Sequence, residues 1–305
     1  MTAIAREVKT EQVYRRGIAL VLLAGVCWSS IGLVIRLMQQ ARAWQVLFYR
    51  SIALCIFLLI LIAVRNNGHV RTVFRKAGLS AVLGGLALVM TFSGGVVAIM
   101  ETTVANAMFL LFSTPFFAAC LGYFILGESI RCATWITMSF AGIGISIIVL
   151  ESISVGNLSG NLAAILSALG FALFTVALRW GQNTDMLPVV FFGGIFTIIF
   201  AGSICLITGQ EFQLPIHDIG LAFTLGVFQL GVGLAFYTLG SKALPAAELA
   251  LLSMSEVLLG PFWVWLVLDE MASSYTLLGG AVLLAAIVGN ALFGMRQQPF
   301  PPTFP

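Results

Sequence analysis

Residues 102–129 read TTVANAMFLLFSTPFFAACLGYFILGES, and residues 244–271 read LPAAELALLSMSEVLLGPFWVWLVLDEM. The two stretches align without a gap at an offset of 142 positions (244 − 102), which pairs Ser113 with Ser255 and Glu128 with Glu270. Each contains a mainly apolar run of the length, about 20 residues, that a helix needs to cross a bilayer core of about 30 Å. The stretches therefore predict two related copies of a membrane-spanning unit.

The composition of the whole chain agrees with a lipid environment. Hydrophobic residues make up 60% of the 305 positions and charged residues only 9%, whereas soluble domains carry about 25% charged residues. So few charges cannot cover a water-exposed surface. The net charge is only +3, and the basic residues are spread over short loops, so the composition argues against a nucleic-acid partner.

Apolar runs of spanning length occur ten times, each bounded by charges, prolines or polar clusters. The first follows a polar segment, residues 1–16, and is too long for the apolar region of a signal peptide. We therefore expect an all-α membrane protein with ten transmembrane helices and no large extramembrane domain. The expected spans are residues 17–38, 44–64, 77–99, 103–125, 132–150, 160–180, 188–208, 218–240, 246–268 and 275–294.

The lysines and arginines predict the orientation, because basic residues near span ends are retained on the cytoplasmic side. With the N-terminus inside, 12 of the 15 Lys and Arg residues lie on inner segments. Arg36 and Arg42 lie on outer segments, and Arg50 lies inside the second span. Both termini are thus predicted to be cytoplasmic, including the proline-rich tail at residues 295–305.

The duplication predicts the architecture. A second match, at an offset of 143, aligns the first span with the sixth and pairs Trp28 with Phe171 and Arg36 with Arg179. Residues 17–150 and 151–294 are therefore expected to form two five-helix repeats. Because five is odd, the second repeat must be inverted relative to the first, which is a recurrent design of secondary transporters.

The fourth and ninth spans resemble those of the drug/metabolite transporter superfamily, in its ten-span EamA branch. Pro115, followed by Gly127 and Glu128, matches the family's pattern of a proline and a later Gly-Glu ending. In the second repeat Glu256 and Glu270 also match. The resemblance covers nearly all of the chain, from about residue 17 to residue 294.

The second repeat departs from the family pattern at three positions. Val257 replaces the usual proline, Asp269 replaces the usual glycine, and Pro261 lies four positions farther on. A short match at Trp28, Ser29 and Ser30 resembles the amino-acid exporters, including those of aromatic amino acids. The resemblance implies a transporter of small molecules in a bacterial inner membrane.

Two ionisable residues lie deep in the predicted spans. Glu256 is the one carboxylate near a span's midpoint, where a charge is costly unless it is paired, hydrated or protonated. It is a candidate for proton coupling or for binding a substrate amine, and the alternative is a hydrogen bond between packed helices. Arg50 is a candidate for a substrate carboxylate, and the alternative is a structural role.

Further candidates are aromatic and polar residues at mid-span. Trp28 is unusual because tryptophan prefers the membrane interface, and with Phe171 it is predicted either to line a central cavity or to pack in the core. Polar groups at such depth are expected to face the protein interior. The remaining candidates for substrate binding are Ser29, Asn106, Phe109 and Ser113 in the first repeat and Gln229 and Tyr237 in the second.

These features favour a secondary transporter that exports small neutral or zwitterionic metabolites, apolar or aromatic amino acids above all. The chain has no G-x-x-x-x-G-K-[ST] loop for a nucleotide, and no cofactor or metal site is expected. Other metabolites or drugs, such as purines, nucleosides and cationic drugs, remain alternatives as cargo. An intramembrane enzyme is disfavoured, since the spans contain no histidine and no paired aspartates. The expected partners are the substrate and membrane lipid, with the protein as a monomer or homodimer.

Overall fold

The structure is a computed structural model that describes residues 3–127, 132–155, 157–181, 186–240, 252 and 255–295. Within these ranges every regular element is a helix. The helices are α1 (Ala3–Ser29), α2 (Ile31–Arg36), α3 (Ala43–Arg65), α4 (Val70–Glu101), α5 (Val104–Leu111), α6 (Thr114–Leu126), α7 (Cys132–Val155), α8 (Leu158–Trp180), α9 (Leu187–Ile207), α10 (Ile216–Thr224), η1 (Leu225–Val232), α11 (Gly233–Gly240), α13 (Ser255–Leu268) and α14 (Ser274–Met295).

Seven of the described helical segments are long and apolar enough to cross a membrane, and three shorter apolar helices accompany them. Each of the ten predicted spans overlaps one of these segments. Most of the first part of the ninth predicted span, residues 246–254, lies outside the described residues. The long segments are Gln12–Arg36, Ala43–Arg65, Val70–Glu101, Val104–Leu126, Leu158–Trp180, Leu187–Ile207 and Ile216–Gly240, and the shorter ones are Trp135–Glu151, Ser255–Leu268 and Ser274–Gly289.

Four of the long segments are interrupted helices, and in Val70–Glu101 the interruption is at Gly78, whose backbone is non-helical with φ 67° and ψ −168°. The hydroxyls of Ser30 and Ser113 each donate to a carbonyl three residues earlier, at 2.6 Å, where α1 gives way to α2 and α5 to α6. Pro115 stands in the first turn of α6, where its missing N–H costs nothing. The eighth span changes into a π-helix, η1, over eight residues. Irregular backbone at membrane depth occurs where it is buried in protein or lines a cavity.

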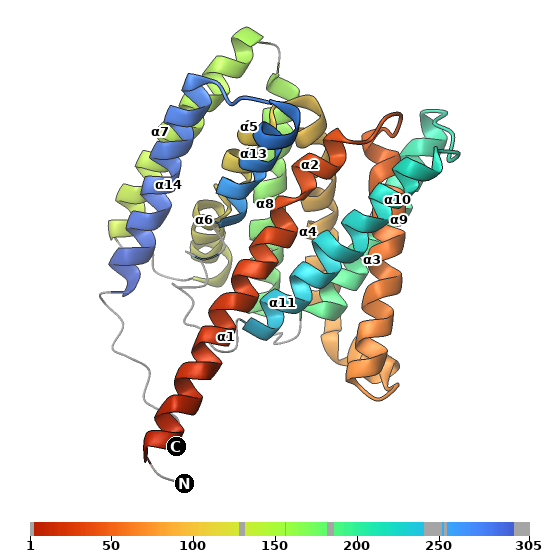
Figure 1. The fold of residues 1–305 in the computed structure, drawn as a ribbon, viewed down its shortest axis with the longest axis vertical. Coiled ribbons are helices and arrows are strands. Elements are labelled where there is room, and N and C mark those ends of the chain that lie inside the picture. The colour runs from red at the N-terminus through yellow and green to blue at the C-terminus, as the bar shows by residue number, and fades with distance from the viewer. Residues whose placement is uncertain are drawn as a thin grey trace.

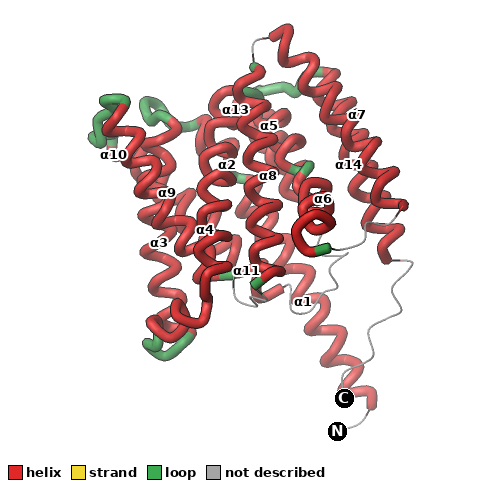
Figure 2. The backbone as a smooth tube through the Cα atoms, turned by 180° about the vertical axis from the view of Figure 1, so that it is seen from behind, coloured by secondary structure: helices red, strands yellow, loops and turns green. Residues whose placement is uncertain are grey.

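The helices form one bundle with α8 near its middle, beside α4 (Figure 1). The helices α7 and α14 run side by side at one edge, and α3, α9 and α10 lie at the opposite edge, as the view from behind also shows (Figure 2). The end of the bundle at which α2 ends and α3 begins is called the α2–α3 end below. The topology prediction places this end on the outer side of the membrane.

The edge pair of α7 and α14 is held by a reciprocal glycine contact. A β-carbon added at Gly144 would lie 2.6 Å from the Gly279 carbonyl oxygen, and one added at Gly279 would lie 2.7 Å from the Gly144 carbonyl oxygen. Close backbone approach of this kind is a common basis of helix association in membranes. By contrast, a β-carbon at Gly142, also on α7, would meet nothing within 4 Å.

This difference gives a stability prediction with an internal control. We expect Gly144→Val to destabilise the protein by about 1–3 kcal/mol, because overpacking forces the two backbones apart. Gly142→Val should change the thermal unfolding midpoint in detergent little. Equal midpoints for the two variants would show that the glycine contact does not hold the pair together.

Candidate functional site

An ion pair closes part of the α2–α3 end. Arg36 Nε lies 2.8 Å from Glu270 Oε2, and Arg36 Nη2 donates to the Thr102 carbonyl at 2.7 Å. Glu270 Oε1 accepts the backbone N–H of Val104 at 2.8 Å. One carboxylate therefore joins α2, the start of α5 and the end of α13. Glu270 is an anchor at a helix end, and its predicted counterpart, Glu128, lies outside the described residues.

A second carboxylate fixes the loop between α2 and α3. The fully buried Asp218 side chain, at the start of α10, accepts backbone N–H groups of Gln39, Gln40 and Ala41 at 3.1, 2.8 and 2.9 Å. The half-exposed His217 ring contributes a contact at 3.1 Å from Nδ1 to Asp218 Oδ1. The loop therefore depends on a carboxylate supplied by the other half of the chain.

We expect Asp218→Asn to loosen this loop, because an amide oxygen accepts more weakly than a carboxylate oxygen and the amide nitrogen cannot accept at all. Hydrogen bonds to a charged group contribute about 1.5–3 kcal/mol, so amide hydrogen exchange at residues 39–41 should accelerate by roughly 10-fold or more. His217→Gln, which leaves the three backbone bonds intact, is the matched control. Unchanged exchange in the Asn variant would contradict this role.

The stripe of candidate residues predicted on the fourth span is buried inside the protein. Asn106 is buried and accepts a short hydrogen bond from the Thr276 hydroxyl of α14. Phe109 is 6% exposed, and its ring fills the space where a β-carbon of Gly280 would stand. Ser113 is fully buried at the break between α5 and α6. The structure thus places Asn106 and Phe109 against α14 and Ser113 at the break between α5 and α6.

Ser29 also lies in a contact between two helices. Its side chain is fully buried, donates to the Val26 carbonyl and accepts the indole N–H of Trp263 at 3.0 Å. This bond joins α1 to α13. These four candidates, Ser29, Asn106, Phe109 and Ser113, are buried within the helix packing and are left out of the site described next.

The face of α8 that carries Phe171 changes from buried to open along the helix. Ala164 and Ala168, nearer the α2–α3 end, are fully buried, whereas Phe171 is 42% exposed and Arg179, farther along, is exposed. The exposure of this face therefore increases along α8 away from the α2–α3 end. The Phe171 ring packs on Phe174, with ring centroids 5.4 Å apart, and no ring contact among the described residues joins it to Trp28.

The aromatic partner of Trp28 is Tyr237 of α11, with ring centroids 5.2 Å apart. A β-carbon added at Gly233 would lie against the Trp28 indole nitrogen, and one added at Gly226 would lie against the Arg50 carbonyl oxygen. Gln229 lies between these two glycines on η1, is 5% exposed and has a side-chain oxygen without a hydrogen-bond partner. The segment formed by η1 and the start of α11 therefore packs on α1 at Trp28 and on the backbone of α3 at Arg50.

Arg50 has the largest fully buried side chain among the described residues and is 2% exposed. Its guanidinium carbon lies 5.1 Å from the centre of the Phe92 ring, a cation–π contact. Its Nε has no hydrogen-bond partner, no carboxylate among the described residues pairs with it, and the neighbouring Ser51 hydroxyl is also unpaired. A buried cation in this state lacks the anion that would normally accompany it.

Glu256 lies on α13, which packs against α1. It is the second residue of α13 and is partly buried, with no hydrogen bond or ion pair to any described residue. A β-carbon added at Gly25 would meet the Ser255 hydroxyl and lie 3.7 Å from the Glu256 nitrogen. Gly25 and Trp28 are one helical turn apart on α1. Five of the predicted residues, Trp28, Arg50, Gln229, Tyr237 and Glu256, are called the central group below.

Sequence reasoning missed two features of the central group. The π-helix that carries Gln229 was not predicted, although the glycine-rich run GVFQLGVG at residues 226–233 was a signal. Single-turn π segments are frequent at functional sites. The ring of Phe92 under Arg50 was also missed, since an apolar residue in an apolar span gives no signal of its own.

Comparison with known proteins agrees with this architecture. The model of the EamA-like transporter family matches twice, at residues 15–150 and 158–292. The chain is 26% identical over 286 residues to the pseudopaline exporter CntI of Pseudomonas aeruginosa, which covers 90% of this chain and 95% of that protein. It is 23% identical over 278 residues to the S-adenosylmethionine uptake transporter of Rickettsia prowazekii, covering 87% and 91%.

The fold also has a solved counterpart. It is a crystal structure whose description names no function, and it superposes on this chain with a TM-score of 0.65. The superposition covers 93% of this chain and 99% of the other chain. At 18% sequence identity this similarity concerns the fold alone.

Proposed function

Because the chain belongs to the EamA-like transporter family, we propose that it exports amino acids with apolar or aromatic side chains by alternating access. The family and the relatives make the protein a multi-pass membrane transporter of a small molecule and not an enzyme. The choice of amino acids as cargo is the proposal. It rests on the chemistry of the central group.

The observation that carries the proposal is the unpaired Arg50. A buried guanidinium needs an anion, and a carboxylate fits its planar array of donors. Only one such cation is present in the central group, which suits a single carboxylate better than a phosphorylated cargo. The unpaired oxygen of Gln229 calls for a hydrogen-bond donor, and an ammonium group of the same substrate supplies one.

The aromatic pair of Trp28 and Tyr237 would hold the substrate's side chain. Both rings offer large apolar surfaces that favour aromatic or aliphatic groups. The cargo of one relative supports this choice in part, because S-adenosylmethionine also carries an amino group and a carboxylate on one carbon. Carboxylate, ammonium and apolar side chain would then each have a partner in the central group.

Glu256 would couple export to a proton. A single carboxylate can hold an ammonium group when it is ionised, or a proton, but not both at once. Competition of this kind exchanges one outgoing substrate for one incoming proton. The closed α2–α3 end would be the outer gate, so the central group would face the cytoplasm in this state.

Counterflow tests the proposal. Proteoliposomes preloaded with unlabelled phenylalanine should take up labelled phenylalanine saturably, and unlabelled leucine or tryptophan outside should compete. The same counterflow assay with purines, nucleosides and cationic drugs tests the alternative cargoes. Saturable counterflow of one of those compounds, with none for amino acids, would show that the cargo is misassigned.

A further inference from the structure

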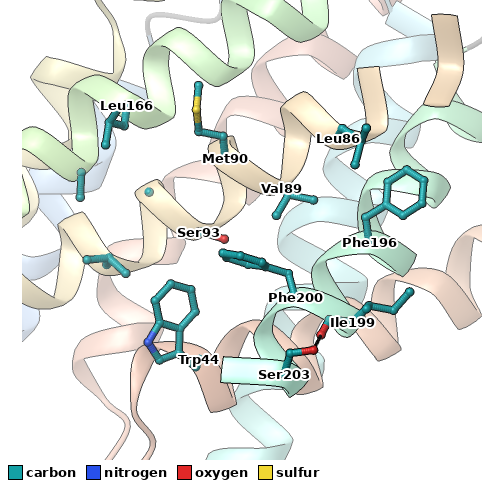
Figure 3. A pocket seen from close by; sticks show the side chains of 13 residues that line it. Trp44, Leu86, Val89, Met90, Ser93, Leu166, Phe196, Ile199, Phe200 and Ser203 are labelled. Atoms are coloured by element: carbon teal, nitrogen blue, oxygen red, sulfur yellow. Dashed lines mark hydrogen bonds between the residues drawn. The ribbon is translucent and has the colours of Figure 1, made fainter. Parts of the chain in front are cut away.

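A groove on the side of the bundle lies apart from the central group. Its cavity volume is about 710 Å³, and its walls come from α3, α4, α8 and α9 (Figure 3). No charged side chain lines it. Its polar groups are the indole N–H of Trp44 and the hydroxyls of Ser93 and Ser203.

The groove extends along one leaflet of the membrane. Trp44, the second residue of α3, lies at the α2–α3 end, where an interfacial tryptophan is expected. The lining residues of α4 run from Val97 to Leu86, which at a rise of about 1.5 Å per residue is about 16 Å. That length is close to half of a hydrocarbon core of about 30 Å. The groove therefore reaches from the interface almost to the midplane.

The floor of the groove is closed. A β-carbon added at Gly94 would lie 2.5 Å from the Ala163 carbonyl oxygen, so α4 and α8 touch beneath it. Its rim is open to lipid, because Leu86, Leu166 and Ile199 are half or more exposed. An occupant must therefore enter from the membrane and not from the transport path.

One group in the groove lacks a partner. The Ser93 side chain is 8% exposed, and its hydroxyl makes no hydrogen bond. Other helical hydroxyls donate to the carbonyl four residues earlier, as Ser203 does at 2.7 Å and Thr91 at 3.2 Å, whereas Ser51 and Ser255 are unpaired like Ser93. In Figure 3 the Ser93 oxygen lies within the group of lining side chains, beside the Phe200 ring. A buried donor in this position calls for an acceptor supplied by a ligand.

We propose that this groove binds one acyl chain of a membrane phospholipid, with an ester carbonyl accepting the Ser93 hydroxyl. The chain would lie along Leu86, Met90 and Phe196, and Trp44 would contact the glycerol region. The cavity volume of about 710 Å³ is too small to enclose a helix from a second copy. At a diameter of about 10 Å and a length of about 16 Å, a helix occupies roughly 1,250 Å³.

Photo-crosslinking tests the lipid site in the reconstituted full-length protein. The probe is a phosphatidylethanolamine with a diazirine midway along one acyl chain, and adducts are located by peptide mass spectrometry. We expect adducts to concentrate on residues 86–97 and 196–203. Adducts spread evenly over all exposed apolar faces, or links between two protein copies at the groove, would overturn the proposal.

Substitutions sharpen the test. Ser93→Ala should lower the adduct yield in the groove by roughly 2- to 10-fold, because it removes one hydrogen bond. Val89→Trp should fill the groove and lower the adduct yield there at least as much. The control is Ile60→Trp, at a position of α3 that is 59% exposed and outside the groove. A thermal unfolding midpoint close to that of the wild-type protein would show that each variant is folded. Undiminished labelling in a folded Val89→Trp protein would count against the site.

Discussion

Arg50→Gln is expected to lower phenylalanine counterflow by roughly 10- to 150-fold, the range that corresponds to the 1.5–3 kcal/mol of a hydrogen bond to a charged group. Arg50 is buried, stacked on Phe92 and without an anionic partner among the described residues. The substrate's carboxylate would provide that partner, and glutamine cannot replace its charge. Arg50→Lys keeps the charge but not the paired donors, and should recover only part of the loss.

A substrate series separates recognition from a structural role. Phenethylamine lacks the carboxylate of phenylalanine, so the wild-type protein should bind it weakly and Arg50→Gln should barely change its binding. Competition against labelled phenylalanine measures both. If the variant folds, by its unfolding midpoint, yet loses affinity for both compounds equally, Arg50 does not hold the carboxylate.

Glu256→Gln is expected to abolish proton-driven transport while leaving exchange in place. Glutamine accepts hydrogen bonds from an ammonium group but cannot take up a proton, so the variant can carry substrate in both directions without coupling. In proteoliposomes with a pH gradient, accumulation of phenylalanine should fall at least about 10-fold, which corresponds to about 1.4 kcal/mol of lost driving force.

The control for Glu256 is counterflow at equal pH on both sides. This exchange should stay within a few-fold of that of the wild-type protein and become insensitive to the common pH. Accumulation that persists in the variant at the wild-type level would remove Glu256 from the coupling step. Loss of counterflow as well as accumulation would assign it to substrate binding alone.

The fold could be predicted from the sequence because its main signal is local. The length of an apolar run determines whether a helix can cross a bilayer, and charges and prolines mark where the run ends. The similarity between residues 102–129 and 244–271 then indicated that the two halves of the chain are related copies. The interruption at Ser30 and the π-helix depend on tertiary packing, which a local pattern such as the glycine-rich run at residues 226–233 does not specify.

The candidate site was predicted in part for a similar reason. Arg50, Gln229 and Glu256 were found because polar groups are rare at membrane depth and must face the protein interior. The same reasoning included Asn106, which the structure places against α14. A helical stripe shows which residues share a face but not which neighbour that face meets. The same limit applies to Phe109, since its contact with Gly280 joins residues 171 positions apart (280 − 109).

The ion pair of Arg36 and Glu270 has a consequence for the opposite side of the membrane. The two repeats align Arg36 with Arg179 and Glu270 with Glu128. If the halves exchange conformations during the cycle, as the predicted inverted duplication implies, then Arg179 and Glu128 are expected to form the equivalent ion pair when the outer side opens. A double-mutant cycle on these two residues, read out as the balance between the two facing states, should give a coupling opposite in sign to that of Arg36 and Glu270. The balance between these two ion pairs, which occupy equivalent positions in the two repeats, would then determine which side of the membrane the carrier faces at rest.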